Sequence, residues 1–194
     1  MIESKQDLRF YLECDKVALS KHTKRPAFKH DIIWTYERLL RYCEYYKNCR
    51  KDFLGRIIGK LYKFRFVCLG QRLGFSVGFN VFGPGLAIQH YGCLVVNGLA
   101  KVGENCRIHE GVCIAASGGT DAAATIGNNV FLGTGAKIIG NITVADNVVI
   151  GANAVVTKSI TEEGTTWAGV PAKKISNKGS ENYCVRATDI VRKG

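Results

Sequence analysis

Proline is scarce in this chain, whose 194 residues include only 3 prolines but 22 glycines. This combination excludes proline-rich linkers and indicates many tight corners, where glycine adopts a positive φ without strain. No apolar run approaches the length of a membrane span, and charged residues are spread through "MIESKQDLRFYLECDK" at the N-terminus. We therefore expect a cytoplasmic chain without a signal peptide. The length fits one domain with a substantial core.

The eight cysteines include no CxxC pair, and several of them fall inside apolar segments. In a cytoplasmic chain this spacing favours free, buried thiols over disulfides. Zinc sites commonly contain cysteines in CxxC pairs. Because this chain has no such pair, we do not predict a metal site built from its cysteines.

Positive charge is distributed unevenly along the chain. Of the net charge of +11, residues 1–75 carry +9, residues 76–170 carry −2 and residues 171–194 carry +4. Such basic regions could bind nucleic acid, an anionic membrane surface or a phosphorylated cofactor. We expect no nucleic acid, and membrane-surface contact by the basic N-terminal region remains an alternative.

Aliphatic residues recur at steps of six through the centre of the chain, and glycine often follows them. A period of six fits neither an amphipathic helix nor an alternating strand. It predicts a solenoid in which each hexapeptide forms a short strand and a corner, and three hexapeptides complete a triangular coil. The predicted inward residues are Phe82, Ile88, Leu94, Val102, Ile108, Ile114, Ile126, Leu132, Ile138, Val144, Ile150 and Val156.

Two steps break this period. The step from Leu94 to Val102 is eight, which predicts two inserted residues between them. The step from Ile114 to Ile126 is twelve, with Thr120 in the aliphatic position between them.

Residues before the repeats have apolar and aromatic side chains at helical spacing, for example Ile33, Tyr36 and Leu40. They predict two or three helices, of which the last, "IIGKLYKFRFVCLGQRL", is basic. We interpret them as a cap over the open end of the solenoid. The segment from Asn177 onward is polar and basic, and we predict that it is mobile. The predicted parts are an α-helical N-terminal region (1–75), a β-helix domain (76–170) and a basic C-terminal tail (171–194).

Three segments make a family recognisable: "GPGLAIQHYGCLVVNGLAKVGENCRIHEGVCI", "IGNNVFLGTGAKIIGNITVADNVVIGANAVVTKSI" and the closing "AGVPAKKI". Over residues 75–176 the chain resembles the serine O-acetyltransferase branch of the hexapeptide acyltransferases. Its N-terminal part is more similar to members associated with polysaccharide clusters. The resemblance implies a mainly β fold, a left-handed parallel β-helix, which departs from the usual right-handed crossover. It also implies a homotrimer and acetyl-CoA in the groove between neighbouring coils.

Acyl transfer to a hydroxyl requires a base for the hydroxyl proton, and imidazole suits this role near neutral pH. Of the four histidines, His22 and His30 fall in the basic N-terminal region. In the family the histidine of an Asp-His-(small)-Thr-Gly motif is the base, and "QHYG" matches it by position, so the resemblance implies that His90 is the base. The alternative is a structural histidine on the solenoid wall. His109 follows 19 residues later, about one coil on; it could line the acceptor pocket, act as a second base or face solvent.

This chain departs from the biosynthetic members of the family around the base. Gln89 replaces the aspartate before the histidine, Phe75 replaces an aspartate fifteen residues upstream, and Ala123 replaces an acceptor-site histidine. The acceptor could therefore be L-serine, with Gln89 lining its site, or a sugar hydroxyl of a polysaccharide precursor. The candidates for the partner that orients the base are a backbone carbonyl, Asn97 and Asn80.

Small and basic residues are the candidates for binding acetyl-CoA. The segments "ASGGT" and "GTGAK" have little side-chain bulk, which lets a pantetheine arm lie along the backbone. In the family the lysines near the last coils lie where the phosphates of coenzyme A are expected. A structural role is the alternative, because a tight coil also requires glycine and alanine, and lysines also keep an exposed edge soluble. The predicted cofactor-binding residues are Gly118, Gly119, Thr134, Gly135, Ala136, Ala152, Lys158, Pro171, Lys173 and Lys174.

These features together predict an acetyl-CoA-dependent O-acetyltransferase that acts on L-serine, with a capsular or exopolysaccharide sugar as the alternative acceptor. A non-catalytic trimeric scaffold is the hypothesis from another class. A metal is not expected, because the β-helix carbonic anhydrases need three histidines and the predicted solenoid has two. Biosynthetic members commonly end in an isoleucine that docks into the next enzyme of cysteine synthesis. This chain ends in "VRKG", so we do not expect a cysteine-synthase complex.

Overall fold

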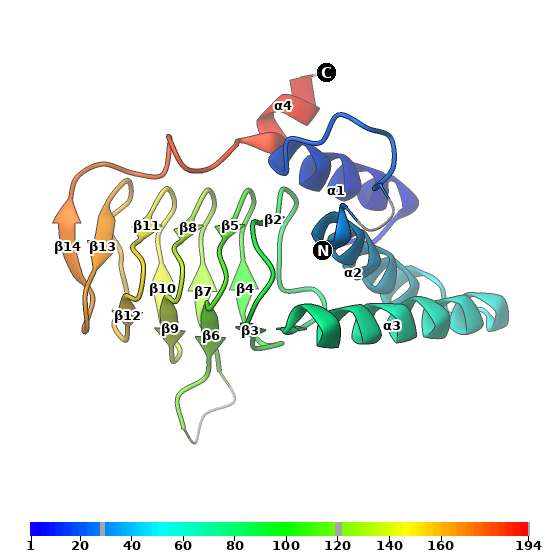
Figure 1. The fold of residues 1–194 in the computed structure, drawn as a ribbon, viewed down its shortest axis with the longest axis horizontal. Coiled ribbons are helices and arrows are strands. Elements are labelled where there is room, and N and C mark those ends of the chain that lie inside the picture. Colours follow the sequence, from blue (N-terminus) through cyan, green and yellow to red (C-terminus); the bar gives the residue numbers. More distant parts are fainter. Residues whose placement is uncertain (28–29, 119–121, 194) are drawn as a thin grey trace.

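Three sheets, parallel except for the last strand, form the walls of a triangular prism in the computed structural model, which describes residues 1–27, 30–118 and 122–193 (Figure 1). Sheet A contains β1 (Phe75–Val77), β3 (Leu94–Val96), β6 (Cys113–Ala115), β9 (Lys137–Ile139) and β12 (Val155–Val156). Sheet B contains β4 (Lys101–Val102), β7 (Thr125–Ile126) and β10 (Thr143–Val144). Sheet C contains β2 (Ala87–Ile88), β5 (Arg107–Ile108), β8 (Phe131–Leu132), β11 (Val149–Ile150), β13 (Thr166–Ala168) and β14 (Lys173–Ser176).

The predicted inward residues form the core of this prism. Each of the twelve is at most 5% exposed, and those of sheet C stack in register from Ile88 through Ile108 and Leu132 to Ile150. Every turn of the chain therefore adds one aliphatic residue to each of three internal columns. The prediction of a left-handed parallel β-helix is confirmed.

The two inserted residues lie at a different corner from the one predicted. The register of sheet A pairs Val96 with Ile114, so Val96 occupies the column position that the sequence assigned to Leu94. The step of eight therefore begins at Ile88, and the next step is six. The extra residues consequently lengthen the turn that carries His90.

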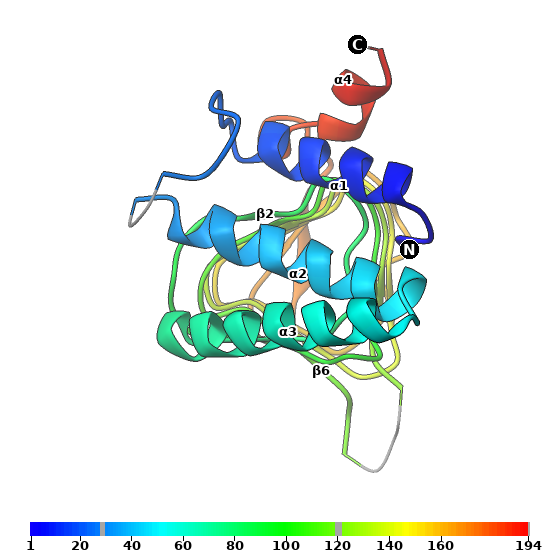
Figure 2. The same ribbon diagram turned by 90° about the vertical axis from the view of Figure 1, so that its right-hand side faces the viewer.

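A longer excursion leaves the coil between β6 and β7. Ile114 and Ile126 lie on consecutive sheets, so their step of twelve adds six residues to one corner. The described flanks of this segment project away from the prism (Figures 1 and 2). Thr120, which was assigned a ladder position, lies outside the described residues.

Helices cover the N-terminal end of the prism, as predicted (Figure 2). They are α1 (Lys5–Ala18), α2 (Ile32–Cys49) and α3 (Phe53–Leu73), and α2 packs between the other two. The Ser4 side chain caps α1, the Asp52 side chain caps α3, and Gly74 ends α3 with a φ of 77°. None of the helices in the described ranges combines the length and apolarity of a membrane span.

The cap supplies hydrogen-bond partners to the exposed edge of the first coil. An edge strand leaves backbone N–H groups without partners unless another element covers them. Asp15 of α1 accepts from the N–H groups of Gly85 and Leu86, each at 2.9 Å. Glu44 of α2 accepts from the N–H of Asn80 at 2.7 Å. These buried carboxylates replace the coil that would otherwise precede the first one.

Arg41 of α2 donates hydrogen bonds to backbone carbonyls of the same edge. Its guanidinium donates to the carbonyl oxygens of Phe82 at 2.9 Å and Gly83 at 2.7 Å. It also donates to both Asp15 oxygens, at 2.7 and 3.2 Å, and to Glu44 at 3.1 Å. The guanidinium is fully buried, and all of its hydrogen-bonding partners lie either in the cap or on the first coil.

The C-terminal segment is ordered rather than mobile, which corrects the expectation. After β14 it returns along the prism to α4 (Ala187–Lys193), which packs on α1 (Figure 1). Thr188 is fully buried and exchanges two hydrogen bonds with the Asn105 side chain, at 2.9 and 3.1 Å. Arg107 donates to the Tyr183 carbonyl at 3.0 Å. A few buried polar contacts thus hold a segment whose composition predicts mobility.

Candidate active site

His90 lies at the corner where sheet C passes into sheet A, in the lengthened turn between β2 and β3. Its side chain is exposed and its ring contacts that of His109 edge to face, with centroids 5.5 Å apart. His109 follows β5 one coil further on, and its backbone N–H donates to the Leu132 carbonyl at 3.0 Å. The structure therefore brings together the two histidines that the sequence singled out.

The strand that leads into His90 is fixed from both sides. The N–H of Ile88 donates to Glu37 of α2 at 2.8 Å, and the N–H of Gln89 donates to the Ile108 carbonyl at 3.1 Å. Burial, reinforced by Asp15, raises the pKa of the Glu37 carboxyl well above its usual range. The cap therefore positions the turn that carries His90 as well as closing the prism.

Glu110 joins the two histidines, and the sequence analysis missed it. One potential ligand atom from each of His90, His109 and Glu110 lies within 4.8 Å of the other two, and His109 Nδ1 lies 3.9 Å from Glu110 Oε2. A hydrogen bond from its own backbone N–H, one with Thr134 and the positive potential of both histidines lower the pKa of Glu110, so the carboxyl is ionised at neutral pH. A coil of 18 residues plus the inserted pair equals its separation from His90, and this spacing could have identified it.

His109 is a neutral imidazole at neutral pH. Burial, the Arg107 guanidinium and His90 lower its pKa below 6.5, and Glu110 opposes them only in part. Its Nε2 atom is buried and has no hydrogen-bond partner among the described residues. The other side of the ring contacts Phe131, with centroids 5.1 Å apart. His109 therefore offers an unoccupied polar atom beside His90.

The same cluster has the donor set of a metal site. Two imidazoles and one carboxylate are ligands that Zn²⁺ accepts in proteins. Within residues 1–27, 30–118 and 122–193, His90, His109 and Glu110 form the one group of three such side chains close enough to hold an ion. A count of histidines alone does not predict this site, because its third potential ligand is a carboxylate.

Neither asparagine proposed as the orienting partner contacts His90. The Asn80 amide exchanges hydrogen bonds with Asn48 of α2, at 2.9 and 3.1 Å. Asn97 lies beyond the other end of β3, where its side chain accepts from the N–H of Leu99 at 2.8 Å. The side chains of His109 and Glu110 lie close to His90 instead.

A cavity of 290 Å³ lies between the turn that carries His90 and the cap. Gln89 and Tyr91, the neighbours of His90 on either side, line it together with Lys21 and Asp31, which form an ion pair at 2.5 Å. The Nε1 atom of Trp34 is buried there without a partner among the described residues. The cavity can offer both signs of charge and a free hydrogen-bond donor to a small polar ligand.

Several predicted cofactor-binding residues lie along the same edge of the prism as His90. These are Thr134, Gly135, Ala136 and Ala152. The turns of this edge are stacked: the N–H of Gly135 donates to the Glu110 carbonyl at 2.9 Å, and the N–H of Asn153 donates to the Thr134 carbonyl at 2.8 Å. Gly135 has a φ of 73°, and a Cβ there would collide with Asn153. Ala136 is fully buried, so its side chain cannot contact a ligand, whereas Thr134 and Ala152 are exposed.

The basic candidates lie at the C-terminal end of the prism. Lys158, Pro171 and Lys173 line a cavity of 270 Å³ together with Trp167. Two of the predicted lysines thus lie beside one cavity. Lys174 instead forms an ion pair with Glu162.

The remaining predicted cofactor residues belong to the excursion after β6. Gly118 is exposed, and a Cβ there would meet no atom within 4 Å. Gly119 lies outside the described residues. This excursion leaves from the corner between sheets A and B, whereas His90 lies at the corner between sheets C and A. Within one chain the predicted cofactor residues therefore occupy two different edges of the prism.

Comparison with known proteins shows which family this chain belongs to. Residues 123–158 match the family described as "Bacterial transferase hexapeptide (six repeats)". The chain is 34% identical over 132 residues to a serine acetyltransferase of Helicobacter pylori strain J99, a match that covers 62% of this chain and 77% of that enzyme. The chain belongs to the serine acetyltransferase family.

Other members agree in fold and differ in length. A serine acetyltransferase of Synechococcus elongatus is 36% identical over 99 residues, which cover 50% of this chain but only 40% of that enzyme. The structure of a Brucella abortus serine acetyltransferase in complex with coenzyme A superimposes with a TM-score of 0.64 at 28% identity. That superposition covers 93% of this chain and 69% of the Brucella chain. The superimposed part therefore includes most of the β-helix and of its cap.

Proposed function

We propose that this protein is an acetyl-CoA-dependent O-acetyltransferase whose acceptor is L-serine. One observation carries the proposal: in a chain of the serine acetyltransferase family, His90 is exposed at a corner of the prism beside a neutral imidazole and an ionised carboxylate. An exposed imidazole with a carboxylate nearby is suited to accept a proton and to stabilise the resulting charge. The relatives named above carry the activity, and one of them was solved with coenzyme A.

The reaction proceeds by direct transfer between the two substrates. His90 takes the proton of the acceptor hydroxyl as its oxygen attacks the carbonyl carbon of the thioester. Glu110 stabilises the imidazolium that forms, because a carboxylate favours a cation within a few ångströms. The tetrahedral intermediate then collapses, the carbon–sulfur bond breaks, and the thiolate of coenzyme A takes the proton back from His90. Backbone amides near residues 116–118 of a neighbouring copy are candidates to stabilise the oxyanion, because within one chain these residues lie at a different edge of the prism from His90.

The cavity beside Gln89 is proposed as the acceptor site. L-Serine carries an ammonium and a carboxylate, and the cavity offers Asp31 and Lys21 as groups of opposite charge. A sugar of a capsular or exopolysaccharide precursor is the second candidate. It is favoured by Gln89, an uncharged amide at a position where the family has aspartate and where it lines the cavity. Release of coenzyme A with L-serine, compared with nucleotide sugars, distinguishes the two acceptors.

The donor site is proposed to lie along the edge that runs from His90 to the cavity lined by Lys158 and Lys173, where the two ammonium groups would bind the phosphates of coenzyme A. We further propose a cytoplasmic homotrimer in which a neighbouring copy covers this edge. Large apolar side chains next to His90 and on the strand that follows it support this arrangement, since Tyr91 is 71% exposed and Val95 is also exposed.

Replacing His90 tests the assignment directly. In a trimer of unchanged mass and melting temperature, His90→Ala should lower kcat by about 10²- to 10⁴-fold, the usual contribution of a general base. His22→Ala, at an exposed position before α2, is the matched control and should leave kcat unchanged. If His90→Ala retains activity within a few-fold, His90 is not the base, and a trimer that binds no coenzyme A would instead support a scaffold.

A further inference from the structure

Helix α3 is apolar on two opposite faces, and only one of them is covered. Its inner face packs against α2 and the first coil through residues such as Phe66 and Leu73, which are buried. Its outer face carries large apolar side chains that are between 43% and 77% exposed. These residues, the outer ridge, are Phe53, Leu54, Ile57, Leu61, Phe64 and Val67. A helix with two apolar faces requires two partners.

The outer ridge is continuous along the helix. From Phe53 to Val67 its members follow one another at steps of three and four residues, apart from Leu54 at its border. This spacing places them on one face of an α-helix. The 21 residues of α3 extend over about 31 Å. Contiguous exposed apolar surface of this extent marks an interaction site rather than scattered surface residues.

Positive charge borders the outer ridge, and α3 contains no acidic residue. At 100° per residue, Arg56 and Lys63 lie along one side of the ridge and Arg65 and Arg72 lie along the other. Lys60 lies within it. The partner of this face must therefore accept apolar side chains in its centre and cations along both margins.

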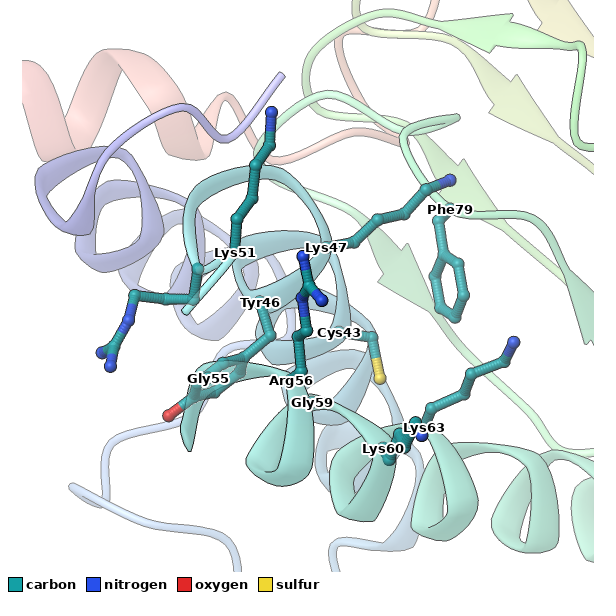
Figure 3. Close-up of a pocket in the computed structure, with 11 residues that line it drawn as sticks. Cys43, Tyr46, Lys47, Lys51, Gly55, Arg56, Gly59, Lys60, Lys63 and Phe79 are labelled. Atoms are coloured by element: carbon teal, nitrogen blue, oxygen red, sulfur yellow. The ribbon is translucent and has the colours of Figure 1, made fainter. Parts of the chain in front are cut away.

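A basic groove adjoins the ridge between α2 and α3 (Figure 3). Its cavity has a volume of 490 Å³, and no carboxylate lines it. Figure 3 shows Lys47 and Lys63 on either side of Phe79, with Arg56 nearby. Gly59 forms part of the floor, where it allows α3 to approach α2 closely, because a Cβ would lie 3.1 Å from that of Tyr46. The cations that line this basic groove are Lys47, Arg50, Lys51, Arg56, Lys60 and Lys63.

We propose that the outer ridge and the basic groove form a docking surface for an anionic phospholipid bilayer. The ridge enters the boundary between headgroups and acyl chains, and the cations of the groove and margins bind lipid phosphates. A second copy related by a two-fold axis fits less well, because such a contact would bring the same cations face to face. Nucleic acid would leave the central apolar side chains without apolar partners. An anionic bilayer would thus balance the excess positive charge of the N-terminal region.

Vesicle binding by the full-length protein tests this inference. The protein should sediment with vesicles of equal parts phosphatidylcholine and phosphatidylglycerol, and not with phosphatidylcholine alone. Salt should weaken the binding, since exposed charges are screened. A lysine near an anionic surface contributes about fivefold to partitioning, so Lys60→Glu with Lys63→Glu should weaken binding by about 25-fold or more. Phe64→Ser should weaken it also, since the ridge would lose an aromatic side chain.

Matched controls come from other surfaces of the chain. Ile175→Ser removes an apolar side chain of β14 that is 65% exposed, close to the 68% of Phe64, and Lys178→Glu reverses one exposed charge. Both should bind vesicles like the unmodified protein. Equal binding to neutral and anionic vesicles would overturn the proposal, and so would α3 variants that bind normally. A change of oligomeric mass in these variants without a change in vesicle binding would assign the ridge to a second copy. His90→Ala should bind normally, so this result does not depend on the proposed activity.

Discussion

Replacement of Arg41 by methionine tests how the helical cap is attached to the coils. The guanidinium donates five hydrogen bonds, to Asp15, to Glu44 and to the carbonyls of Phe82 and Gly83, all from a fully buried position. Methionine fills a similar volume flexibly and donates none of these bonds. The substitution therefore removes the cation while leaving two buried carboxylates and two backbone carbonyls in place.

The expected loss of stability is large. Removing one partner of a buried ion pair costs about 3–5 kcal/mol, because an uncompensated charge remains. Each backbone carbonyl left without a donor costs about 1–3 kcal/mol. These costs share one side chain and do not add in full, so we expect the free energy of unfolding to fall by about 4 kcal/mol or more. For a chain of this length that corresponds to a melting temperature lower by about 8–16 °C.

Thermal unfolding followed by circular dichroism, at one fixed protein concentration, measures this change. Arg9→Met, at an exposed position of α1, is the matched control and should shift the free energy by no more than about 0.5 kcal/mol. Replacing Asp15, Arg41 and Glu44 together by apolar residues should not restore stability, although it often does for simple ion pairs, because here the carboxylates also bind backbone N–H groups. An Arg41→Met protein that melts within about 2 °C of the unmodified one would refute this account.

Four further predictions concern the site. Glu110→Gln should lower kcat, because a negative charge that stabilises the imidazolium formed during the reaction is lost; an unchanged kcat would show that the carboxylate does not act on the base. Lys158→Ala with Lys173→Ala should raise KM for acetyl-CoA more than it lowers kcat, with a smaller effect at high salt, whereas Lys178→Ala should change neither. Since the pKa of His109 is lowered, the folded state binds fewer protons than the unfolded one just below pH 6.5, so the free energy of unfolding should fall as the pH drops from 6.5 toward that lowered pKa, and His109→Asn should flatten the decline in denaturant titrations. Zn²⁺ should inhibit competitively with the acceptor by occupying the two histidines and Glu110, and EDTA should restore activity; inhibition that persists in Glu110→Gln with unchanged affinity would argue against this site.

The fold was largely predictable because the six-residue period depends on which residues point inward, and this depends little on the corners between them. The position of the insertion was not, since Leu94 and Val96 are both aliphatic and both buried. Only pairing across sheet A, where Val96 lies opposite Ile114, decides between them. The C-terminal segment was predicted wrongly because its composition is polar, while its docking depends on a few contacts such as Thr188 with Asn105.

The candidate site was predictable as far as its residues are chemically conspicuous. His90 and His109 are rare imidazoles on an apolar scaffold, so each attracts a hypothesis without a structure. Glu110 lies in a turn, where a carboxylate usually faces solvent, and its role depends on the added pair in the coil before it. Buried carboxyl groups in the cap, such as Glu37, were missed because their partners are backbone groups far along the chain, and backbone groups leave no pattern in a sequence.

The polar contacts between the cap and the first coil also fix the register of the whole stack relative to the helices. Successive coils of a solenoid are so similar that a stack displaced by a whole coil would bury much the same aliphatic columns. Asp15, Arg41 and Glu44 bind one backbone segment, residues 80–86. That segment holds glycines at 83 and 85, where a Cβ would collide with the next coil at Gly103 and Asn105. The cap therefore fixes which coil is the first of the stack. It also sets the lengthened corner beside the helices, so the position of the proposed base along the prism is decided at the end of the molecule where the repeat begins.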